Sequence, residues 1–385
     1  MRETCAGFCA ASRGDIREAT FEREERWRET IDMGEMGTMK IQRLFLTTII
    51  LVCSGIFACA GSIAQGQASV PVISGGVGFL STTNGGTNYL EPIIVPVLSA
   101  PLGDHLLVEA RGELLEFSSQ ATNGGYQRQY FNELDYTQLD YTVNSWLTIV
   151  GGRFLTPFGM YNERLIPIWI HNLQDPPLIF VIGTRTSSSS LGGMVRGAFA
   201  PSSKVEVNYA AYFSAADKSA YWGAGRAAGF RTGIFLPNRR LEIGMSYQRF
   251  LQGQRFNSFG AHLSWQPYTV PLDVKAEFAH SASGYGYWAE AAYRLSRFHG
   301  AESAIGRLQP VFRMQQFFRL QQIAGDSLPG VSTQQADFGF DYYLPHQVRI
   351  NSNYSRQFSS QGNVNIWDAG ITYRFMFPLW PGGSK

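Results

Sequence analysis

Cysteine is absent from most of this chain of 385 residues. All four cysteines lie before residue 60: Cys5, Cys9, Cys53 and Cys59. The remainder of the chain therefore contains neither a disulfide framework nor a cysteine-based metal site. Lysine is also scarce, since residues 65–385 contain only Lys204, Lys218, Lys275 and Lys385. Arginines and acids nearly balance in these residues, so the clustered basic face expected of a nucleic-acid-binding protein is missing.

Long hydrophobic runs are also missing from the body of the chain. Beyond residue 64 there is no charge-free apolar run of about 18 residues, the length that a transmembrane helix requires. Aromatic residues make up 14% of the sequence and charged residues only 16%, which favours a sheet-rich protein. A closed β-sheet is the other structure that satisfies every backbone polar group within lipid. If the chain crosses a membrane, we therefore expect a β-barrel.

The first 64 residues differ from the rest and divide into two parts. Residues 1–38 are polar, carry both signs of charge and lack a periodic apolar face, so we predict a disordered extension. Residues 39–64 have the pattern of a secretory signal peptide: a basic start at Lys40 and Arg43, an apolar stretch, and small residues before the expected cleavage site. We therefore predict an exported protein whose body is residues 65–385.

The position of this signal peptide is unusual. An export signal ordinarily begins with a short positive leader, whereas residues 1–38 contain many acids. We expect the natural chain to start at Met39 or Met36, which would make the extension non-native. Two alternatives stay open: a genuine long leader, or lipid modification at Cys59.

Alternating hydrophobicity divides the body into segments of about 10–14 residues, the signature of outer-membrane strands. In the last segment, Trp367 and Ile371 share one face, while Asp368 and Thr372 share the other. Sixteen such segments are found: 70–81, 87–98, 105–118, 131–142, 145–155, 185–199, 204–213, 222–236, 240–251, 255–266, 271–282, 285–298, 307–320, 332–344, 347–358 and 363–377.

We therefore predict an all-β fold, a transmembrane antiparallel up-and-down β-barrel of sixteen strands, with fourteen or eighteen strands as alternatives. The connections divide into tight turns and longer polar loops, as in outer-membrane barrels whose chain starts and ends in the periplasm. A barrel of this size leaves a water-filled channel. A soluble β-sandwich also alternates, but the signal peptide and the aromatic ends of the strands favour the barrel.

Residues 156–183 form the long interruption in this series of strands. Pro157, Pro167 and Pro176 exclude a regular strand or an uninterrupted helix, yet residues 165–170 are too apolar for a loop in water. The interruption follows the fifth segment and is therefore the third loop on the outside. We expect it to fold into the barrel mouth and narrow the pore. The alternative for its apolar part is a subunit contact.

Residues 147–159, with the sequence Leu-Thr-Ile-Val-Gly-Gly-Arg-Phe-Leu-Thr-Pro-Phe-Gly, resemble the strand-to-loop segment of phosphate-selective (O/P-like) and related bacterial porins. The aromatic-rich segment 373–377 is similar to the terminal signature that outer-membrane proteins present to the barrel-assembly machinery. The resemblance implies a sixteen-stranded, homotrimeric porin whose third loop folds inward. Two features of this chain differ from those porins. The lysines are scattered rather than clustered as in phosphate-selective members, and residues 378–385 follow the terminal aromatic.

Charged residues on water-facing strand positions are candidates for lining the pore. They are Arg153, Arg294, Arg313, Arg349, Arg374, Glu242, Glu290 and Asp341. Four residues of the loop are candidates for the constriction: Glu163, Arg164, His171 and Asp175. Acidic and basic rows facing each other create a transverse field, and the mixture of signs predicts weak selectivity. The alternative is that these charges only pair with neighbours on the barrel wall.

The sequence thus predicts a porin in the outer membrane of a Gram-negative type of cell, which lets small hydrophilic solutes or ions diffuse passively. We expect no cofactor and no metal, because His171 has no His or Cys at ligand spacing. The alternatives are a non-conducting receptor and a barrel enzyme. An enzyme would need a nucleophile beside a base, and Ser187–Ser190, His262 and His280 show no recognisable spacing. A receptor would need long outer loops.

Overall fold

Sixteen antiparallel strands close into one β-barrel within the compact unit Ser69–Lys385. The computed structural model describes residues 70–121, 124–180, 189–215, 225–252, 255–323 and 326–379, apart from the side chain of His299. The predicted extension and signal peptide, residues 1–38 and 39–64, lie outside the described residues and stay predictions.

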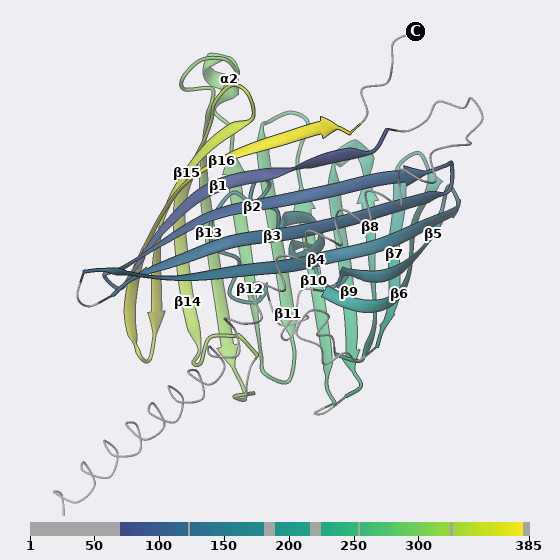
Figure 1. The fold of residues 1–385 in the computed structure, drawn as a ribbon, viewed down its shortest axis with the longest axis horizontal. Coiled ribbons are helices and arrows are strands. Elements are labelled where there is room, and N and C mark those ends of the chain that lie inside the picture. The colour runs from purple at the N-terminus through teal and green to yellow at the C-terminus, as the bar shows by residue number, and fades with distance from the viewer. Residues whose placement is uncertain are drawn as a thin grey trace, which may run out of the picture. The chain divides into compact units, whose positions relative to one another are not determined.

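The strands follow the order of the chain around the barrel, and β16 pairs with β1 to close it (Figure 1). Their bounds are β1 (Val72–Asn84), β2 (Thr87–Leu102), β3 (Leu106–Gln120), β4 (Tyr126–Asn144), β5 (Leu147–Leu155), β6 (Ser189–Ser202), β7 (Val205–Ser214), β8 (Ala227–Leu236), β9 (Leu241–Phe250), β10 (Asn257–Trp265), β11 (Leu272–His280), β12 (Gly284–Tyr293), β13 (Leu308–Arg319), β14 (Thr333–Tyr343), β15 (Val348–Ser359) and β16 (Gly362–Pro378).

Among the described residues, three short helical pieces lie between strands. A π-helical turn, η1 (Tyr161–Leu165), is part of the long loop, η3 (Pro237–Arg239) joins β8 to β9, and α2 (Ser296–His299) follows β12. In the part of the chain that the structure describes, no helix is long and apolar enough to cross a membrane.

The two faces of the sheet have opposite character. Trp367 on the outside of β16 is 57% exposed, whereas its neighbour Asp368, on the inside, is 2% exposed. The same contrast separates Phe338, 58% exposed, from Asp337, which is fully buried. An apolar exterior and a polar interior are what a barrel needs when its surroundings are lipid. The predicted class, an all-β transmembrane barrel of sixteen strands, is confirmed.

Two strands extend well beyond their predicted ends. The expected segments 87–98 and 131–142 are parts of β2 (Thr87–Leu102) and β4 (Tyr126–Asn144). β3 pairs with β4 from Leu106↔Tyr141 to Gln120↔Tyr126, so the ladder supplies backbone hydrogen bonds to residues that show little apolar alternation. Hydropathy marks only the part of a strand that contacts lipid, and it therefore misses such an extension.

An irregularity in the β3–β4 ladder directs one acid inward. Arg111 pairs with Tyr136 while Gly112 pairs with Leu134, so Asp135 is the extra residue of a β-bulge. A bulge changes the direction of the side chain that it inserts. Here the Asp135 carboxylate lies 2.9 Å from Nε of Arg111, and both side chains are buried.

We predict that Phe338→Arg lowers the free energy of unfolding by about 2–4 kcal/mol, because it places a charge on the lipid face at the middle of β14. Urea unfolding of protein refolded into lipid vesicles measures the loss. Phe338→Leu is the control and should change the stability by less than about 1.5 kcal/mol. Equal stability of the Arg variant and the parent would contradict the assignment of this face to lipid.

Candidate functional site: the lumen and its loop

The loop that follows β5 lies against the inner face of the barrel, and three of its backbone N–H groups fix its first turn. The N–H groups of Met160 and Tyr161 both donate to Oε2 of Glu277 on β11, at 3.2 and 3.3 Å. The N–H of Gly159 donates to Oγ of Ser246 on β9 at 3.0 Å. Backbone groups that the prolines leave without a regular ladder therefore find partners on the barrel wall.

Two ion pairs continue this attachment along the wall. Glu163 pairs with Arg231 on β8, and Arg164 lies 2.6 Å from Glu242 on β9. Glu242 also lies 3.5 Å from the buried His262. The two adjacent loop charges thus pair with opposite charges on adjacent strands, which fixes the orientation of η1.

The middle of the loop is fixed from the far side of the barrel. Arg349 on β15 donates to the carbonyl oxygens of Ile168 at 2.5 Å and His171 at 2.7 Å. Asn172 donates to Glu290 on β12 at 2.7 Å. Further along, Gln174 donates to Thr82 on β1 at 3.0 Å. The loop therefore reaches across the lumen from β8 to β1.

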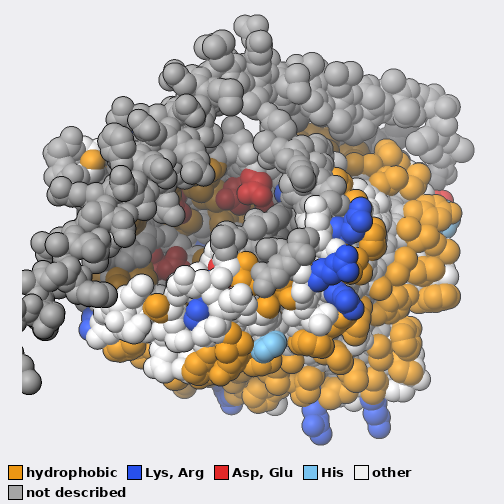
Figure 2. All heavy atoms as spheres, turned by 90° about the horizontal axis from the view of Figure 1, so that it is seen from below, with side chains coloured by type: hydrophobic (Ala, Val, Ile, Leu, Met, Phe, Trp, Pro, Cys, Tyr) orange, Lys and Arg blue, Asp and Glu red, His pale blue; other side chains and the backbone are white. Residues whose placement is uncertain are grey.

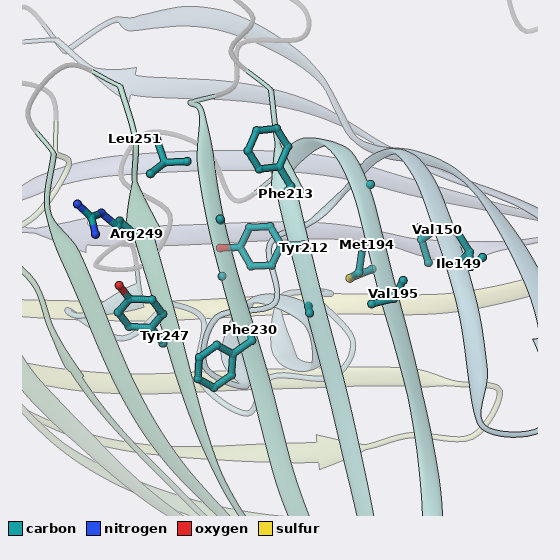
Figure 3. A pocket seen from close by; sticks show the side chains of 14 residues that line it. Ile149, Val150, Met194, Val195, Tyr212, Phe213, Phe230, Tyr247, Arg249 and Leu251 are labelled. Atoms are coloured by element: carbon teal, nitrogen blue, oxygen red, sulfur yellow. The ribbon is translucent and has the colours of Figure 1, made fainter.

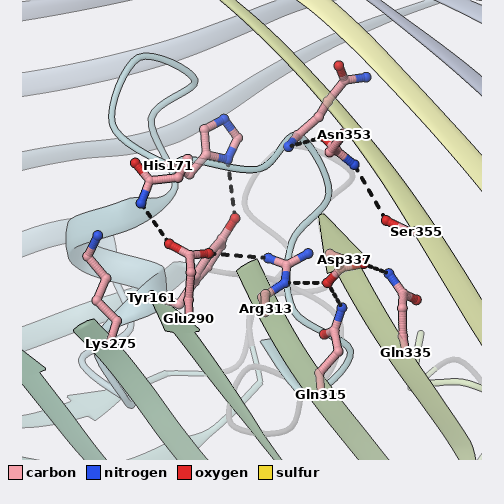
Figure 4. A network of polar contacts seen from close by, with 12 residues as sticks. Tyr161, His171, Lys275, Glu290, Arg313, Gln315, Gln335, Asp337, Asn353 and Ser355 are labelled. Atoms are coloured by element: carbon pink, nitrogen blue, oxygen red, sulfur yellow. Dashed lines mark hydrogen bonds and ion pairs between the residues drawn. The ribbon is translucent and has the colours of Figure 1, made fainter. Parts of the chain in front are cut away.

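A network of charges supports these contacts from below (Figure 4). Arg313 on β13 is 1% exposed, lies 2.8 Å from Asp337 and 4.0 Å from Glu290. Gln315 and Gln335 donate to the same Asp337 carboxylate, at 2.8 and 2.7 Å. A buried guanidinium needs such partners to offset the loss of hydration, so this network is built as one unit.

Apolar residues of the loop fill the space between the polar anchors. Tyr161 packs edge-on against Trp288 of β12, with ring centroids 6.2 Å apart. Ile168 packs with Leu80, Ile93 and Val95, which lie on the inner faces of β1 and β2. The inner wall is therefore apolar beneath Tyr161 and Ile168, and these apolar residues of the loop lie in the lumen.

The remaining wall carries charges of both signs. Arg196 on β6 pairs with Asp140 on β4 and lies 4.0 Å from Glu109 on β3. The Glu133 side chain is 58% exposed and lies 3.7 Å from NH2 of Arg153. Figure 2 shows acidic side chains recessed in a hollow on the face that it views. The lumen thus combines ion-paired and solvent-facing charges.

The four constriction candidates all lie in the loop inside the lumen. Glu163 and Arg164 pair with the wall, as described. Nδ1 of His171 lies 3.3 Å from the hydroxyl of Tyr161, and burial together with the nearby Arg349 guanidinium lowers the pKa of His171 to about 3. Burial and the carboxylate of Asp368 raise the pKa of Asp175 to about 7. His171 is therefore neutral at pH 7, and Asp175 titrates there.

Most of the pore-lining candidates are buried beneath the loop or between charges. Arg153, Arg313, Arg349, Glu242, Glu290 and Asp341 are each less than 10% exposed. Arg294 lies apart from the loop, with its guanidinium 3.9 Å from the Tyr343 ring and its Nε donating to Gly306. Arg374, near the end of β16, is exposed. Pairing with wall neighbours thus accounts for much of the charge on these strands.

Sequence reasoning missed several residues that hold the loop. They are Arg231, Asn172 and Gln174. The buried pair Arg111 and Asp135, which joins β3 to β4, was missed as well. A signal existed for Arg111, because it lies between Glu109 and Glu113 and shares their parity on an alternating strand. The loop amides had no such signal, since their partners lie more than 90 residues away in the sequence.

The structure describes four of the residues considered for an enzyme, Ser189, Ser190, His262 and His280. Nε2 of His262 faces Glu242, and the hydroxyl of Ser190 lies 2.8 Å from that of Thr156. Ser187 and Ser188 lie outside the described residues. Among the described residues, no group of three His, Cys, Asp or Glu side chains could hold a metal ion.

Comparisons with known proteins identify the fold and nothing narrower. No protein-family model matches the sequence, and no curated protein matches it. The high-pH structure of OprB from Pseudomonas putida matches with a TM-score of 0.54 at 11% identity, covering 80% of this chain and 94% of that one. A loop L8 deletion mutant of OmpT, an outer membrane protein of Vibrio cholerae, matches with a TM-score of 0.50 at 9% identity, covering 80% and 100%. At such identities the likeness shows the barrel fold alone.

We predict that Gly159→Ala destabilises the protein by about 1–3 kcal/mol and releases the start of the loop. Gly159 has a φ of +66°, and a Cβ there would overlap the Glu277 carboxylate. Urea unfolding reports the stability, and limited proteolysis between residues 156 and 180 reports the loop.

Gly151→Ala is the matched control, because an added Cβ there meets nothing within 4 Å. This control should stay within about 0.5 kcal/mol of the parent. If both variants behave alike, the loop is not attached through Glu277 as described.

Proposed function

We propose that this protein is a porin of the bacterial outer membrane, a water-filled channel through which small hydrophilic solutes or ions diffuse passively. The observation that carries the proposal is a closed sixteen-stranded barrel whose inward loop is attached to the lumen wall at β8, β9, β11, β12, β15 and β1. Sixteen strands enclose more space than strand side chains can fill. A loop fixed in that space narrows the opening without closing the barrel wall.

Weak selectivity is part of the same proposal. Arg231, Arg313 and Arg349 are each neutralised by a carboxylate beside them, and the wall of β3, β4 and β6 mixes both signs. Rings of one sign would select ions strongly, whereas paired charges leave only a transverse field. The short resemblance of residues 147–159 supports kinship with phosphate-selective (O/P-like) and related porins. The scattered lysines argue against phosphate as the preferred solute.

Several further parts of the proposal rest on the sequence. They are export by a cleaved signal peptide, assembly through the terminal aromatic strand by the barrel-assembly machinery, a homotrimeric state in outer-membrane lipid, and the absence of enzymatic activity and cofactors. The aromatic end of β16, where Phe375 and Phe377 stack at 5.7 Å, supports the second of these.

The direct test is ion current and solute flux through the purified barrel. In a planar bilayer we expect stepwise current increases, and in liposomes we expect swelling in small sugars that weakens as the sugar becomes larger. Heat-denatured protein is the control. A correctly folded barrel that gives neither current nor swelling would contradict the porin proposal and favour a non-conducting receptor or a barrel enzyme.

We also predict a pH-dependent selectivity that depends on Asp175. Its raised pKa of about 7 means that the carboxylate is mostly ionised at pH 8 and mostly protonated at pH 5. Lowering the pH therefore removes a negative charge from the lumen, and the cation-to-anion permeability ratio should fall. Reversal potentials in a salt gradient measure the ratio.

Asp175→Asn should have a low cation-to-anion permeability ratio at both pH values. The difference in this ratio between pH 8 and pH 5 should therefore be smaller than in the parent. His171→Gln is the control, because a histidine that is neutral at both pH values contributes no charge to the change. An undiminished pH response of the Asn variant would show that another group is responsible.

A further inference from the structure

A pocket opens on the lipid-facing side of the barrel, outside the lumen (Figure 3). It has a volume of about 700 Å³ and spans β5 to β9. Exposed apolar residues line its sides. Among them, Ile149 is 46% exposed, Phe213 is 51% exposed and Phe230 is 40% exposed. Nothing in the proposed channel uses this surface, so its shape requires a separate explanation.

The pocket arises from the order of side-chain sizes across the strands. One row of neighbours runs Gly193, Phe213, Ala228 and Arg249, and the next runs Val195, Ala211, Phe230 and Tyr247. Gly193, Ala211 and Ala228 are small, and they leave a hollow beside the aromatic side chains of Phe213, Phe230 and Tyr247. An added Cβ at Gly193 would meet only one atom within 4 Å, at 3.9 Å.

One end of this hollow is cationic. Arg249 lies on the outer face of β9, is exposed and lines the pocket. Arg226 is also exposed, and its carbonyl accepts a hydrogen bond from the N–H of Leu251, another lining residue. In the described part of the chain, neither guanidinium has a carboxylate within ion-pair distance. The sequence has no acid between Asp217 and Glu242, or between Glu242 and Asp273.

An apolar hollow beside two exposed arginines fits an amphipathic anion. Guanidinium groups bind phosphate oxygens through charge-assisted hydrogen bonds, and acyl chains fill apolar grooves that open into lipid. A second copy related by a twofold axis is a poor occupant, because that contact would bring the arginines of both copies together.

We propose that this pocket binds a phosphorylated glycolipid of the lipid A class, with an acyl chain in the hollow and a phosphate on Arg249. The arginines lie where β9 ends and β8 begins, at the same end of the barrel as the long loop after β5. In the orientation expected for a porin this end faces outward, so the choice of an outer-leaflet lipid rests on the proposed function.

Native mass spectrometry of the whole barrel in detergent tests the proposal, with lipid A, phosphatidylglycerol and phosphatidylcholine as probes. The parent protein should retain one lipid A molecule and bind phosphatidylcholine far more weakly. Arg249→Gln should weaken lipid A binding by about tenfold or more, because it removes a charge-assisted contact. Arg240→Gln, which changes an exposed arginine at the opposite end of β9, should bind like the parent.

Gly193→Leu fills the hollow and should weaken the binding of every lipid. If Gly193→Leu does not fold, Ala211→Leu is the variant that fills the hollow in its place. The proposal would be overturned if Arg249→Gln and a correctly folded Gly193→Leu or Ala211→Leu both bound lipid A as the parent does. Equal binding of phosphatidylglycerol would overturn the choice of lipid A, and loss of oligomers in the filled variant would identify a second copy as the occupant.

Conductance of Arg249→Gln should equal that of the parent, because Arg249 lies outside the lumen. This measurement separates the two claims. A barrel that binds lipid A but passes no current would refute the channel alone. A conducting barrel without lipid A binding would refute the pocket assignment alone.

Discussion

The structure depends on the requirement that no backbone polar group in lipid be left without a hydrogen bond. β16 meets this requirement by pairing with β1 over thirteen consecutive residue pairs from Val72↔Pro378 to Asn84↔Ile366. Once the sheet has closed, its inner face encloses a polar space and its outer face must suit lipid. The apolar exterior and the charged interior are both consequences of that closure.

The loop after β5 meets the same requirement inside the barrel. Its prolines prevent a ladder of its own, so Glu277 and Arg349 take the place of ladder partners by binding its N–H and C=O groups. Both groups come from the wall, at β11 and β15, and lie on different sides of the loop. A loop held from two sides is fixed in position, and a fixed position is what a constriction needs.

Alternation predicted the strands, because successive residues of each strand face lipid and water in turn. The signal peptide and the aromatic strand ends then favoured a membrane barrel over a soluble sandwich. Parity also placed Arg313, Arg349 and Asp341 on the inner face. The partners of the loop could not be predicted in this way. Arg349 and His171 are separated by 178 positions, and nothing local in either segment specifies the other. The bulge at Asp135 was missed for a related reason, since one inserted residue breaks the parity on which the prediction depends.

The central claim is that the loop narrows an open channel, and single-channel conductance of the barrel with and without residues 161–175 tests it most directly. Deletion removes η1 and the contacts to Arg231, Glu242, Arg349 and Glu290 while leaving every strand intact. We predict stepwise openings for the parent and larger steps for the deletion variant. Equal steps from two correctly folded barrels would contradict the account.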